Sequence, residues 1–361
     1  MTEAPAGPVR YVALDDLSRF CEAALTAVGA DAATADSATR AMMHATRLGV
    51  DSHGVRLLAH YVKALDGGRL NKGPNLVFHG HKPAAEALDA DHAHGARAAY
   101  AAMERAVALA AHAGVGIVGI QNSSHFGAAG AYALRAAEMG YLGLAVCNSD
   151  SFMRLHEGAV RFHGTNPIAA AAPVPGMRPW LLDMATSAVP FNRVRLYRNL
   201  GEPVPEGAAS DVSGQDTTDP DLAEMLAPLG GIFGFKGAGL AGLVEILSAV
   251  VTGMKLSPEL APMSGPDFST PRGLGAFVLA IDPAVFVARE RYDDGMQRYL
   301  DALRGSEPRA DGQVMAPGDR EWEVERQRRS NGAPVDPGCA ADFEALAARF
   351  DLTLPWAIDG A

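Results

Sequence analysis

The chain has 361 residues, of which 48% are apolar and 20% are charged. This apolar share supports a large core in two or three domains, or in one large mixed domain, and excludes a disordered chain. With 31 basic and 42 acidic residues, the net charge is −11. Nucleic acids and anionic membranes bind basic surfaces, so we exclude both as the main partner. A small anionic ligand is compatible with this charge if a local pocket supplies cations.

Cysteine usage and the N-terminal sequence indicate a cytoplasmic protein. Cys21, Cys147 and Cys339 are far apart and form no CxxC motif, which argues against a disulfide scaffold and a cysteine-based zinc site. The N-terminal residues MTEAPAGPVRYVALDD lack a basic segment followed by an apolar one, so we expect no signal peptide. The longest apolar stretch, residues 237–254, is interrupted by Glu245 and predicts a buried helix rather than a membrane span.

Apolar residues at helical spacing predict a helical N-terminal region over residues 1–75. Its helices are expected over residues 17–29, 32–48 and 52–66. Asp31 is placed to cap the second helix, and the third begins at Asp51 or Ser52. Near the C-terminus, a charged helix over residues 321–331 and an amphipathic helix over 342–350 follow. We expect residues 305–361 to pack back onto the N-terminal helices.

From residue 76 onwards the pattern changes to short strands joined by Gly, Pro and Asn. A helix over residues 96–113 leads into an apolar strand, and a helix over 128–139 leads into another. Further strands are expected over residues 165–174, 179–187 and 275–283, whereas 201–221 is rich in turn residues. Helix and strand in alternation, giving way to strands, predict a mixed sheet with helices packed on it. Residues 76–304 are therefore expected to form a cofactor-binding α/β domain.

The GxGxxG string occurs twice, but neither copy fits a Rossmann dinucleotide loop. That loop follows a strand and opens a helix, so that backbone N–H groups meet the pyrophosphate. The first copy, Gly114-Gly116-Gly119, has the reverse order and ends a predicted helix. The second, Gly237-Gly239-Gly242, opens a helix but follows a glycine-rich segment, which indicates close helix packing. Lys236, directly before it, is either a phosphate ligand or an ordinary surface lysine.

His53 stands at a predicted helix start, where free N–H groups and the helix dipole favour a bound carboxylate. Asp51 or Ser52 is placed to cap this helix. Arg56 lies about one turn further and is a candidate clamp for a substrate carboxylate. Tyr61 lies two turns past His53 on roughly the same face and is a second candidate substrate contact. The structural alternative is that His53 is a helix cap or a packed side chain.

His125 lies in the segment NSSHFG, between a strand end and the next helix, where an amide, hydroxyls and an imidazole come together. Loops at strand ends often carry chemistry. A third polar segment contains Thr165 and Asn166, which we consider substrate-binding candidates, and is followed by Asp183 at the end of an apolar run. A half-buried carboxylate beside a histidine holds one tautomer and supports the imidazolium. The alternative is that Asp183 caps the next turn.

The remaining polar groups do not indicate a metal site or a hydrolase. Asp89, Asp91, His92 and His94 offer metal-binding groups, but their short polar segment is more typical of an exposed turn. The sequence has neither the HExxH motif of zinc proteases nor the GxSxG elbow of serine hydrolases. We therefore expect chemistry that uses no metal.

Read in order, several strings resemble the type 2 malate/L-lactate dehydrogenase family: DSHGVRLLAHYV, NSSHFGAAGAYALRAAEMGYLGLAVCNS, GTNPIA, LLDMATS, TTDP, GFKGAGLAGLVEIL and PGD. The family also includes ureidoglycolate, sulfolactate and diketogulonate dehydrogenases and cyclic ketimine reductases. Each string alone is weak, but the order is unbroken from Asp51 to Asp319. The resemblance implies a non-Rossmann mixed α/β fold, NAD or NADP as cofactor, no metal, and a homodimer with its active site near the subunit contact.

The resemblance also assigns roles to residues. It implies that His53, beside Ser52, transfers a proton, that His125 is a second active-site imidazole, and that hydride moves between the nicotinamide and C2 of a small 2-hydroxy or 2-oxo acid. It places the cofactor at Asn148, Ser149, Asp183, Met184, Ala185, Lys236, Gly318, Asp319 and Arg320. One alternative is a reductase of a cyclic imine carboxylate, which needs the same geometry. Another is a non-catalytic ligand-binding protein, against which the presence of both histidines argues.

Two positions depart from the pattern of the family. Many members have an arginine four residues after the first histidine, where this chain has Leu57. Arg56 lies one residue earlier, which turns it about 100° around a helix. A Gly-Lys pair often follows the DMATS string, whereas Pro190-Phe191-Asn192-Arg193 follows it here. We therefore transfer no preference between NAD and NADP from the family.

Overall fold

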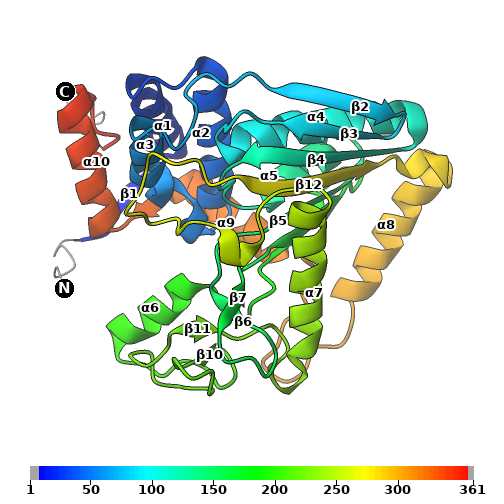
Figure 1. Cartoon of the computed structure of the whole chain (residues 1–361). Coiled ribbons are helices and arrows are strands. Elements are labelled where there is room, and N and C mark those ends of the chain that lie inside the picture. Colours follow the sequence, from blue (N-terminus) through cyan, green and yellow to red (C-terminus); the bar gives the residue numbers. More distant parts are fainter. Residues whose placement is uncertain (1–7, 357–361) are drawn as a thin grey trace.

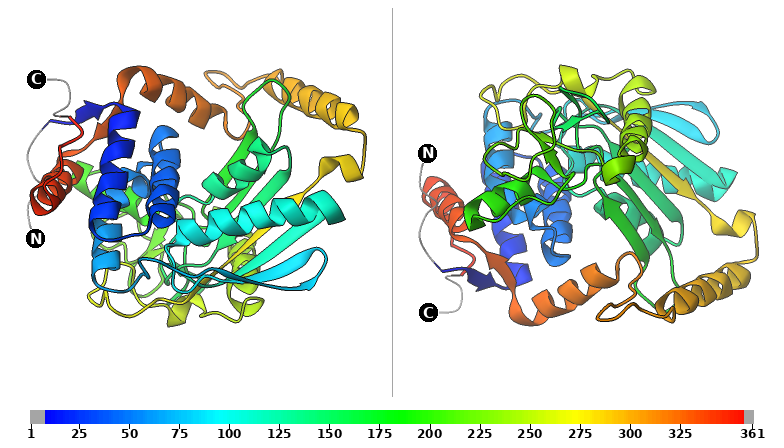
Figure 2. Two further views of the ribbon diagram at one scale, coloured as in Figure 1. Left: turned by 90° about the horizontal axis from the view of Figure 1, so that it is seen from above. Right: turned by 90° about the horizontal axis from the view of Figure 1, so that it is seen from below.

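The computed structural model describes residues 8–356, so residues 1–7 and 357–361 of the predicted terminal region lie outside it. Both ends of the described chain meet in a helical layer, blue and red in Figure 1. Its four helices are α1 (Leu14–Ala27), α2 (Ala32–Arg47), α3 (Leu58–Asp66) and α10 (Pro337–Phe350). Strand β1 (Arg10–Val12) pairs antiparallel with β13 (Ala333–Val335). Helix α10 packs on α1 and α3, and Figure 2 shows these helices side by side.

Local sequence signals explain most of this layer. Asp31 caps α2 as predicted, because its carboxylate accepts a hydrogen bond from Thr34 N at 2.7 Å. The predicted helix from Asp51 is wrong over its first residues. Two 3₁₀ turns, η1 (Asp51–His53) and η2 (Val55–Leu57), precede α3. A Cβ atom at Gly54 would lie 2.4 Å from Thr46 Oγ1, so the chain passes α2 here in an extended conformation that breaks the helix.

A seven-stranded mixed sheet forms the centre of the molecule, with the strand order β2-β3-β4-β12-β5-β8-β9. Of these neighbours, β3 and β4 are parallel and the others are antiparallel. The strands are β2 (Val77–Lys82), β3 (Ala85–Asp89), β4 (Val115–Ser123), β5 (Leu142–Cys147), β8 (Ile168–Ala172), β9 (Trp180–Met184) and β12 (Leu274–Ile281). Helices α4 (Gly95–Ala113) and α5 (Gly130–Glu138) pack on this sheet. The predicted mixed sheet with packed helices is confirmed.

Both glycine strings serve close packing. A Cβ atom at Gly116 would lie 1.8 Å from the Ala106 carbonyl oxygen, so strand β4 needs a glycine where it passes α4. The second string lies inside α7 (Phe235–Glu245) and follows the 3₁₀ turn η3 (Gly231–Phe233), not a strand. A Cβ atom at Gly237 would lie 2.3 Å from the Leu229 carbonyl oxygen. Neither copy has the order of a Rossmann loop.

A second, smaller sheet has the strand order β10-β11-β6-β7 and lies below the central sheet in Figure 1. Its strands are β10 (Ala209–Ser210), β11 (Met225–Leu226), β6 (Met153–Arg154) and β7 (Arg161–His163). The remaining elements are α6 (Phe191–Leu200), α8 (Arg289–Arg304), α9 (Asp319–Asn331), η5 (Ser257–Glu259) and η6 (Pro283–Val285). Helices α6 and α8 were not predicted from the sequence.

The helix predicted over residues 237–254 forms over most of this range, but only one of its faces is buried. Helix α7 continues into a π-helical turn, η4 (Ile246–Val250). One face of this element is buried and carries Glu245, which is 5% exposed, whereas Leu243 is 51% exposed and Val250 is 61% exposed. In the described part of the chain, no helix is both long enough and apolar enough to span a membrane.

Candidate active site

One end of the central sheet gathers the predicted polar segments. Strand β12 lies antiparallel between β4 and β5, and its first residue, Leu274, pairs with Ser123 at the end of β4. Its register with β5 begins at Cys147, the last residue of that strand. The residues that follow β4 and β5 therefore meet the residues that precede β12. This brings His125 and Asn148 to the same end of the sheet.

Two histidines face each other at this end. The ring centroids of His53 and His125 lie 5.8 Å apart, with an angle of 22° between the ring planes. Ser52 Oγ lies 2.9 Å from His53 Nδ1, and the Tyr61 hydroxyl lies 2.9 Å from His125 Nδ1. Each ring is thus held through Nδ1. Among residues 8–356, neither Nε2 atom has a hydrogen-bond partner, whereas both Nδ1 atoms have one.

Burial sets the protonation of this pair. Both residues are half-buried, and desolvation lowers the pKa of His53 and holds the pKa of His125 well below its usual value. Both imidazoles are therefore neutral at pH 7. Tyr61 is buried, and desolvation raises its pKa, so its hydroxyl keeps its proton. Tyr61 therefore contacts His125 through the Nδ1 atom of that ring. The sequence had suggested that Tyr61 contacts the substrate.

The segment from Asp89 to His94 is not an exposed turn throughout. His94 is fully buried, and its Nδ1 caps α4 by accepting a hydrogen bond from Ala96 N at 3.1 Å. Its ring packs edge-on against Tyr61, with centroids 4.2 Å apart. Asp91 accepts a hydrogen bond from Asn71 Nδ2 at 2.8 Å. Within the described residues, no group of three or more His, Cys, Asp or Glu side chains is arranged to hold a metal ion.

Glu245 organises the polar segments that follow β5 and β7. Its buried carboxylate accepts hydrogen bonds from Asn166 Nδ2 at 2.9 Å, Asn148 Nδ2 at 3.3 Å and Ser257 Oγ at 2.7 Å. His163 Nδ1 lies 3.6 Å from Oε2. Burial alone would raise the pKa of Glu245, but these polar neighbours outweigh it and lower the pKa to about 2. The only sequence signal for this residue was one acidic residue inside an apolar stretch.

The structure brings two predicted residues, Asn148 and Asn166, onto Glu245. Their chain neighbours Ser149 and Thr165 contact each other, because the Ser149 hydroxyl accepts a hydrogen bond from Thr165 N at 3.2 Å. Two buried amide oxygens, Asn148 Oδ1 and Asn166 Oδ1, have no hydrogen-bond partner within residues 8–356. Buried acceptors of this kind are costly unless a donor reaches them.

Asp183 does not contact a histidine. Its carboxylate accepts a hydrogen bond from Gly130 N at 2.8 Å and so stabilises the start of α5. A Cβ atom at Gly130 would lie 2.8 Å from Asp183 Oδ2, which explains the glycine. Desolvation raises the pKa of Asp183 to about 6, and the Gly130 hydrogen bond opposes this shift. Water still reaches this residue, which is exposed in the single chain. The alternative interpretation, a cap at a strand end, agrees with this geometry.

Arg56 does not lie free beside His53. Its guanidinium pairs with Asp336, and its side chain is 50% exposed. Asp336 is also the cap of α10, because its other oxygen accepts hydrogen bonds from Gly338 N at 3.0 Å and Cys339 N at 3.2 Å. Arg56 thus ties η2 to α10. This engagement disfavours the predicted carboxylate clamp at Arg56.

The residues predicted at the start of α9 have structural contacts. A Cβ atom at Gly318 would lie 3.1 Å from Leu181 N, so the chain passes close to β9 here. Asp319 pairs with Arg304 at 2.6 Å, which joins α9 to α8. Arg320 is exposed. These contacts hold the residues beside β9, and their predicted cofactor role stays a prediction.

The other predicted cofactor contacts lie on β9 and α7. Met184 pairs with Ile168 in the central sheet, and Ala185 follows directly and is half-buried. Lys236 is exposed in the first turn of α7, with its ammonium group 5.3 Å from the centre of the Phe233 ring. An exposed lysine at the N-terminal end of a helix can reach an anionic group.

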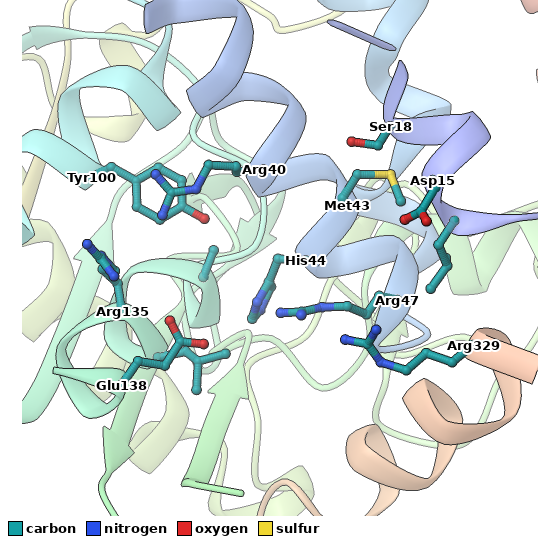
Figure 3. Close-up of a pocket in the computed structure, with 13 residues that line it drawn as sticks. Asp15, Ser18, Arg40, Met43, His44, Arg47, Tyr100, Arg135, Glu138 and Arg329 are labelled. Carbon is teal, nitrogen blue, oxygen red and sulfur yellow. The ribbon is translucent and has the colours of Figure 1, made fainter. Parts of the chain in front are cut away.

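A pocket of about 340 Å³ opens between α2, α5 and α9, and Figure 3 shows its lining. Its cations already have partners: Arg47 lies 3.3 Å from Glu325, and Arg135 lies 3.0 Å from Glu104. His44 faces the pocket (Figure 3), and burial, with Arg47 nearby, lowers its pKa to about 3. The lining includes neither His53 nor His125, so this pocket is separate from the candidate active site.

Comparison with known proteins assigns this chain and its fold to a family of dehydrogenases. The sequence profile of the family described as "Malate/L-lactate dehydrogenase" matches residues 12–344. The malate dehydrogenase of Pyrococcus abyssi is 32% identical over 93% of this chain and 93% of its own length. The (2R)-3-sulfolactate dehydrogenase (NADP(+)) of Chromohalobacter salexigens is 34% identical over 88% of this chain and 93% of its own length.

A solved structure agrees with these relatives. The delta1-piperideine-2-carboxylate reductase of Pseudomonas syringae pvar. tomato superposes with a TM-score of 0.82 and 28% identity, covering 94% of this chain and 99% of the other. The chain belongs to the malate/L-lactate dehydrogenase family. The predicted family and its non-Rossmann mixed α/β fold are thus confirmed, and the chain is an enzyme of the oxidoreductase class.

Proposed function

We propose that the chain transfers a hydride between a nicotinamide cofactor and C2 of a small 2-hydroxy or 2-oxo acid. The observation that carries this proposal is the pair His53 and His125, with rings 5.8 Å apart and each anchored through Nδ1. Oxidation of a hydroxy acid needs a base for the hydroxyl proton, and reduction of an oxo acid needs an acid at the same oxygen. Two imidazoles with free Nε2 atoms supply both functions.

The two anchors suggest different roles for the rings. When His53 donates its Nδ1–H to Ser52 Oγ, its Nε2 carries a lone pair and takes the substrate proton as a base. When the Tyr61 hydroxyl donates to His125 Nδ1, the Nε2 of His125 carries hydrogen and donates to the substrate oxygen. The lowered pKa of His53 suits a base that must be neutral at pH 7. Ser52 and Tyr61 act as positioning residues.

The polar residues around Glu245 fit a nicotinamide. Asn148 Oδ1 and Asn166 Oδ1 are buried acceptors without a protein donor inside residues 8–356, and the carboxamide of nicotinamide offers a matching N–H donor. When bound, the nicotinamide supplies or accepts the hydride. Asn148, Ser149 and Asn166 would hold this group, with Glu245 fixing both amides. The exposed Lys236 suits a cofactor phosphate. Relatives support a nicotinamide cofactor in general, and the choice between NAD and NADP needs measurement.

Reduction of a cyclic imine carboxylate is the second candidate function. It is favoured by the structural similarity to delta1-piperideine-2-carboxylate reductase, and it needs the same hydride and proton geometry at nitrogen instead of oxygen. A non-catalytic role is disfavoured, because a binding protein gains nothing from two anchored imidazoles with free Nε2 atoms.

The test is a turnover screen with NADH and NADPH, using pyruvate, oxaloacetate and a Δ1-piperideine-2-carboxylate, with ureidoglycolate tested in the oxidative direction. We expect cofactor fluorescence to change on binding, and turnover with at least one 2-oxo or 2-hydroxy acid. Turnover with the imine alone would select the second candidate. No change in NADH or NADPH fluorescence would contradict the oxidoreductase proposal as a whole.

We also propose a cytoplasmic homodimer that covers the exposed face of α7. Leu243, Ile246 and Val250 lie one turn apart and are all more than half exposed, and apolar patches of this kind mark protein interfaces. The opposite face of the helix holds Glu245 in the candidate site, so a dimer through α7 puts the site near the subunit contact. Three buried cysteines, all unbonded, suit a reducing compartment.

Light scattering after size-exclusion chromatography tests the dimer. We expect Leu243→Asp with Ile246→Asp to give a monomer. The matched control is Val212→Asp, which changes a residue that is 81% exposed in a loop and should leave a dimer. A wild-type monomer, or a double variant that still dimerises, would contradict this surface.

A further inference from the structure

Two arginines and one aspartate are buried where the segment after α3 meets the segment before β12. Arg69 and Arg272 are each 2% exposed, and Asp150 is 7% exposed. Arg272 Nη2 donates to Asp150 Oδ1, and Arg272 Nε donates to the Ala261 carbonyl oxygen at 2.8 Å. Arg69 Nη1 donates to the Met263 carbonyl oxygen at 2.9 Å. Both guanidinium groups therefore bind the segment between α7 and β12.

Positive charge exceeds negative charge in this cluster. Asp150 is the one buried carboxylate paired with either arginine in the described chain. Arg69 donates hydrogen bonds to backbone carbonyl oxygens, those of Met263 and Asp267. Within residues 8–356, Arg272 Nη1 and Arg69 Nε have no hydrogen-bond partner. A buried cation and a buried free donor both cost free energy until an anion or an acceptor compensates them. Within ion-pair distance, the cluster therefore holds two positive charges and one negative charge, and the exposed carboxylate of Asp267 adds an attraction that water screens.

This cluster lies beside the histidine pair. Arg272 stands two residues before Leu274, which pairs with Ser123 at the end of β4, and His125 is the second residue after that strand. Its positive charge contributes to the lowered pKa of His125, for which burial is the largest cause. The pKa of His60 is lowered in the same way. Burial is the largest cause, the positive charges of Arg69 and Arg272 add to it, and the pKa falls to about 4.

We propose that Arg272 binds the carboxylate of the substrate through Nη1, with Arg69 adding positive potential behind it. This assignment rests on the proposed function, because it names the cation that orients a 2-oxo acid. A carboxylate at this place neutralises the excess charge and gives the free N–H group an acceptor. The contact is a single hydrogen bond, since Nε and Nη2 of Arg272 are already bonded. The carboxylate then holds C2 next to the two imidazoles.

Arg272 takes the role for which the sequence had suggested Arg56. Arg56 is paired with Asp336 and half exposed, so water and a carboxylate already compensate its charge. Arg272 is buried and has an open donor. A carboxylate gains more from a desolvated cation than from an exposed one, because water screens the latter. The acidic protein therefore accepts an anionic substrate through one local excess of positive charge.

Titration with oxalate, a dianion that mimics a 2-oxo acid, tests the assignment in the presence of NADH or NADPH. Arg272→Met should weaken oxalate binding and raise KM for the 2-oxo acid about 10- to 100-fold, with a smaller change in kcat. The Kd of the cofactor, measured by fluorescence, should not change. Arg272→Lys should recover part of the loss, because a lysine keeps the charge but not the fixed fork. Arg298→Met, at an exposed arginine of α8, is the matched control for removal of one positive charge.

Arg272→Met leaves Asp150 buried without a partner and can fail to fold. The double variant Asp150→Asn with Arg272→Met removes both charges, so it should fold and show the same loss of oxalate binding. Asp150→Asn alone keeps the arginine and removes the negative charge that offsets it, so it should bind oxalate at least as tightly as the wild type. Arg56→Met is measured in the same way. Wild-type oxalate affinity in the double variant, or a loss of oxalate affinity in Arg56→Met alone, would overturn the assignment.

The two proposals can fail separately. If the wild type binds no cofactor and turns over no substrate, the proposed function fails, whereas oxalate titration of the cofactor-free chain still tests the anion site. If the wild type turns over a 2-oxo acid and Arg272→Met keeps its KM, the function stands and the role of Arg272 falls.

Discussion

The hydroxyl group of Tyr61 lies 2.9 Å from Nδ1 of His125, although the two residues belong to different layers of the molecule. Tyr61 comes from α3 in the helical layer, and His125 follows β4 of the central sheet. The same tyrosine ring packs against His94 at the start of α4. One side chain thus fixes the orientation of the His125 imidazole, for which we propose a role in proton transfer. The proposed chemistry therefore depends on the relative position of the helical layer and the sheet.

Replacement of Tyr61 by phenylalanine tests this support. Tyr61→Phe keeps the ring and removes the hydrogen bond, which is worth about 0.5–1.5 kcal/mol. We expect kcat to fall about 3- to 10-fold, with cofactor affinity unchanged. The pH profile of kcat should shift, because His125 loses its preference for one tautomer. Wild-type kcat with an unchanged pH profile would mean that Tyr61 only fills space.

His53 should carry the proton transfer. His53→Ala is expected to lower turnover about 100-fold or more, which is the usual contribution of a general acid or base. Cofactor binding should remain, because the residues proposed for the nicotinamide lie around Glu245. His125→Ala is the comparison, and both variants are measured by steady-state turnover and cofactor fluorescence. Near wild-type turnover in His53→Ala, with a large loss in His125→Ala, would move the role to His125.

Features set by local sequence could be predicted. Asp31 caps α2 through an amide three residues further on, and the reversed order of the first glycine string follows from the end of α4 at Ala113 and the start of β4 at Val115. His53 and His125 were chosen because small polar residues surround them at the ends of elements, and the structure brings them together. Such signals need only a few neighbouring residues.

The features missed depend on residues far apart in the chain. The helix expected from Asp51 breaks at Gly54 because the chain there touches Thr46 of α2. Arg56 forms an ion pair with Asp336, which lies near the other end of the sequence. Glu245 gathers Asn148 and Asn166 from two other segments. Periodicity and capping rules contain no information on such contacts, because the packing of layers decides them.

Replacement of Glu245 by glutamine tests the polar network around the proposed nicotinamide site. Glu245→Gln replaces one carboxylate oxygen by an NH₂ group. This group cannot accept the hydrogen bonds that Asn148, Asn166 and Ser257 donate to the carboxylate. We expect a loss of about 3 kcal/mol in the free energy of unfolding at pH 7 and weaker cofactor binding. Urea denaturation and cofactor fluorescence measure the two effects. Glu259→Gln, at an exposed acid on η5, is the matched control. Unchanged cofactor affinity in a folded Glu245→Gln variant would contradict the role of the network.

The acid dependence of stability gives a second readout for Glu245. Its folded pKa of about 2 lies below the usual value of 4.5. The stabilisation is therefore complete above pH 4.5 and is lost as the pH falls towards 2. By pH 3.5 the wild type should lose roughly 1 kcal/mol from this group, and Glu245→Gln should not show this part of the loss.

His94 should also make stability fall in acid, with the same sign of linkage as Glu245 but over a higher pH range. Burial, with a contribution from His60, lowers its pKa from 6.5 to about 3. Below pH 6.5 the unfolded chain binds a proton that the folded chain excludes, so acid favours unfolding. Between pH 7.5 and pH 5, this histidine should cost the wild type about 2 kcal/mol. His94→Asn keeps an acceptor for Ala96 N but cannot take up this proton.

Urea denaturation at pH 7.5 and pH 5 measures the effect. The difference in the free energy of unfolding between the two pH values should be about 2 kcal/mol smaller in His94→Asn than in the wild type. His112→Asn, at an exposed histidine in the last turn of the same helix, should keep the wild-type difference. Equal differences in all three proteins would show that His94 takes up its proton in the folded state as well, and hence that water reaches the core between Tyr61 and α4.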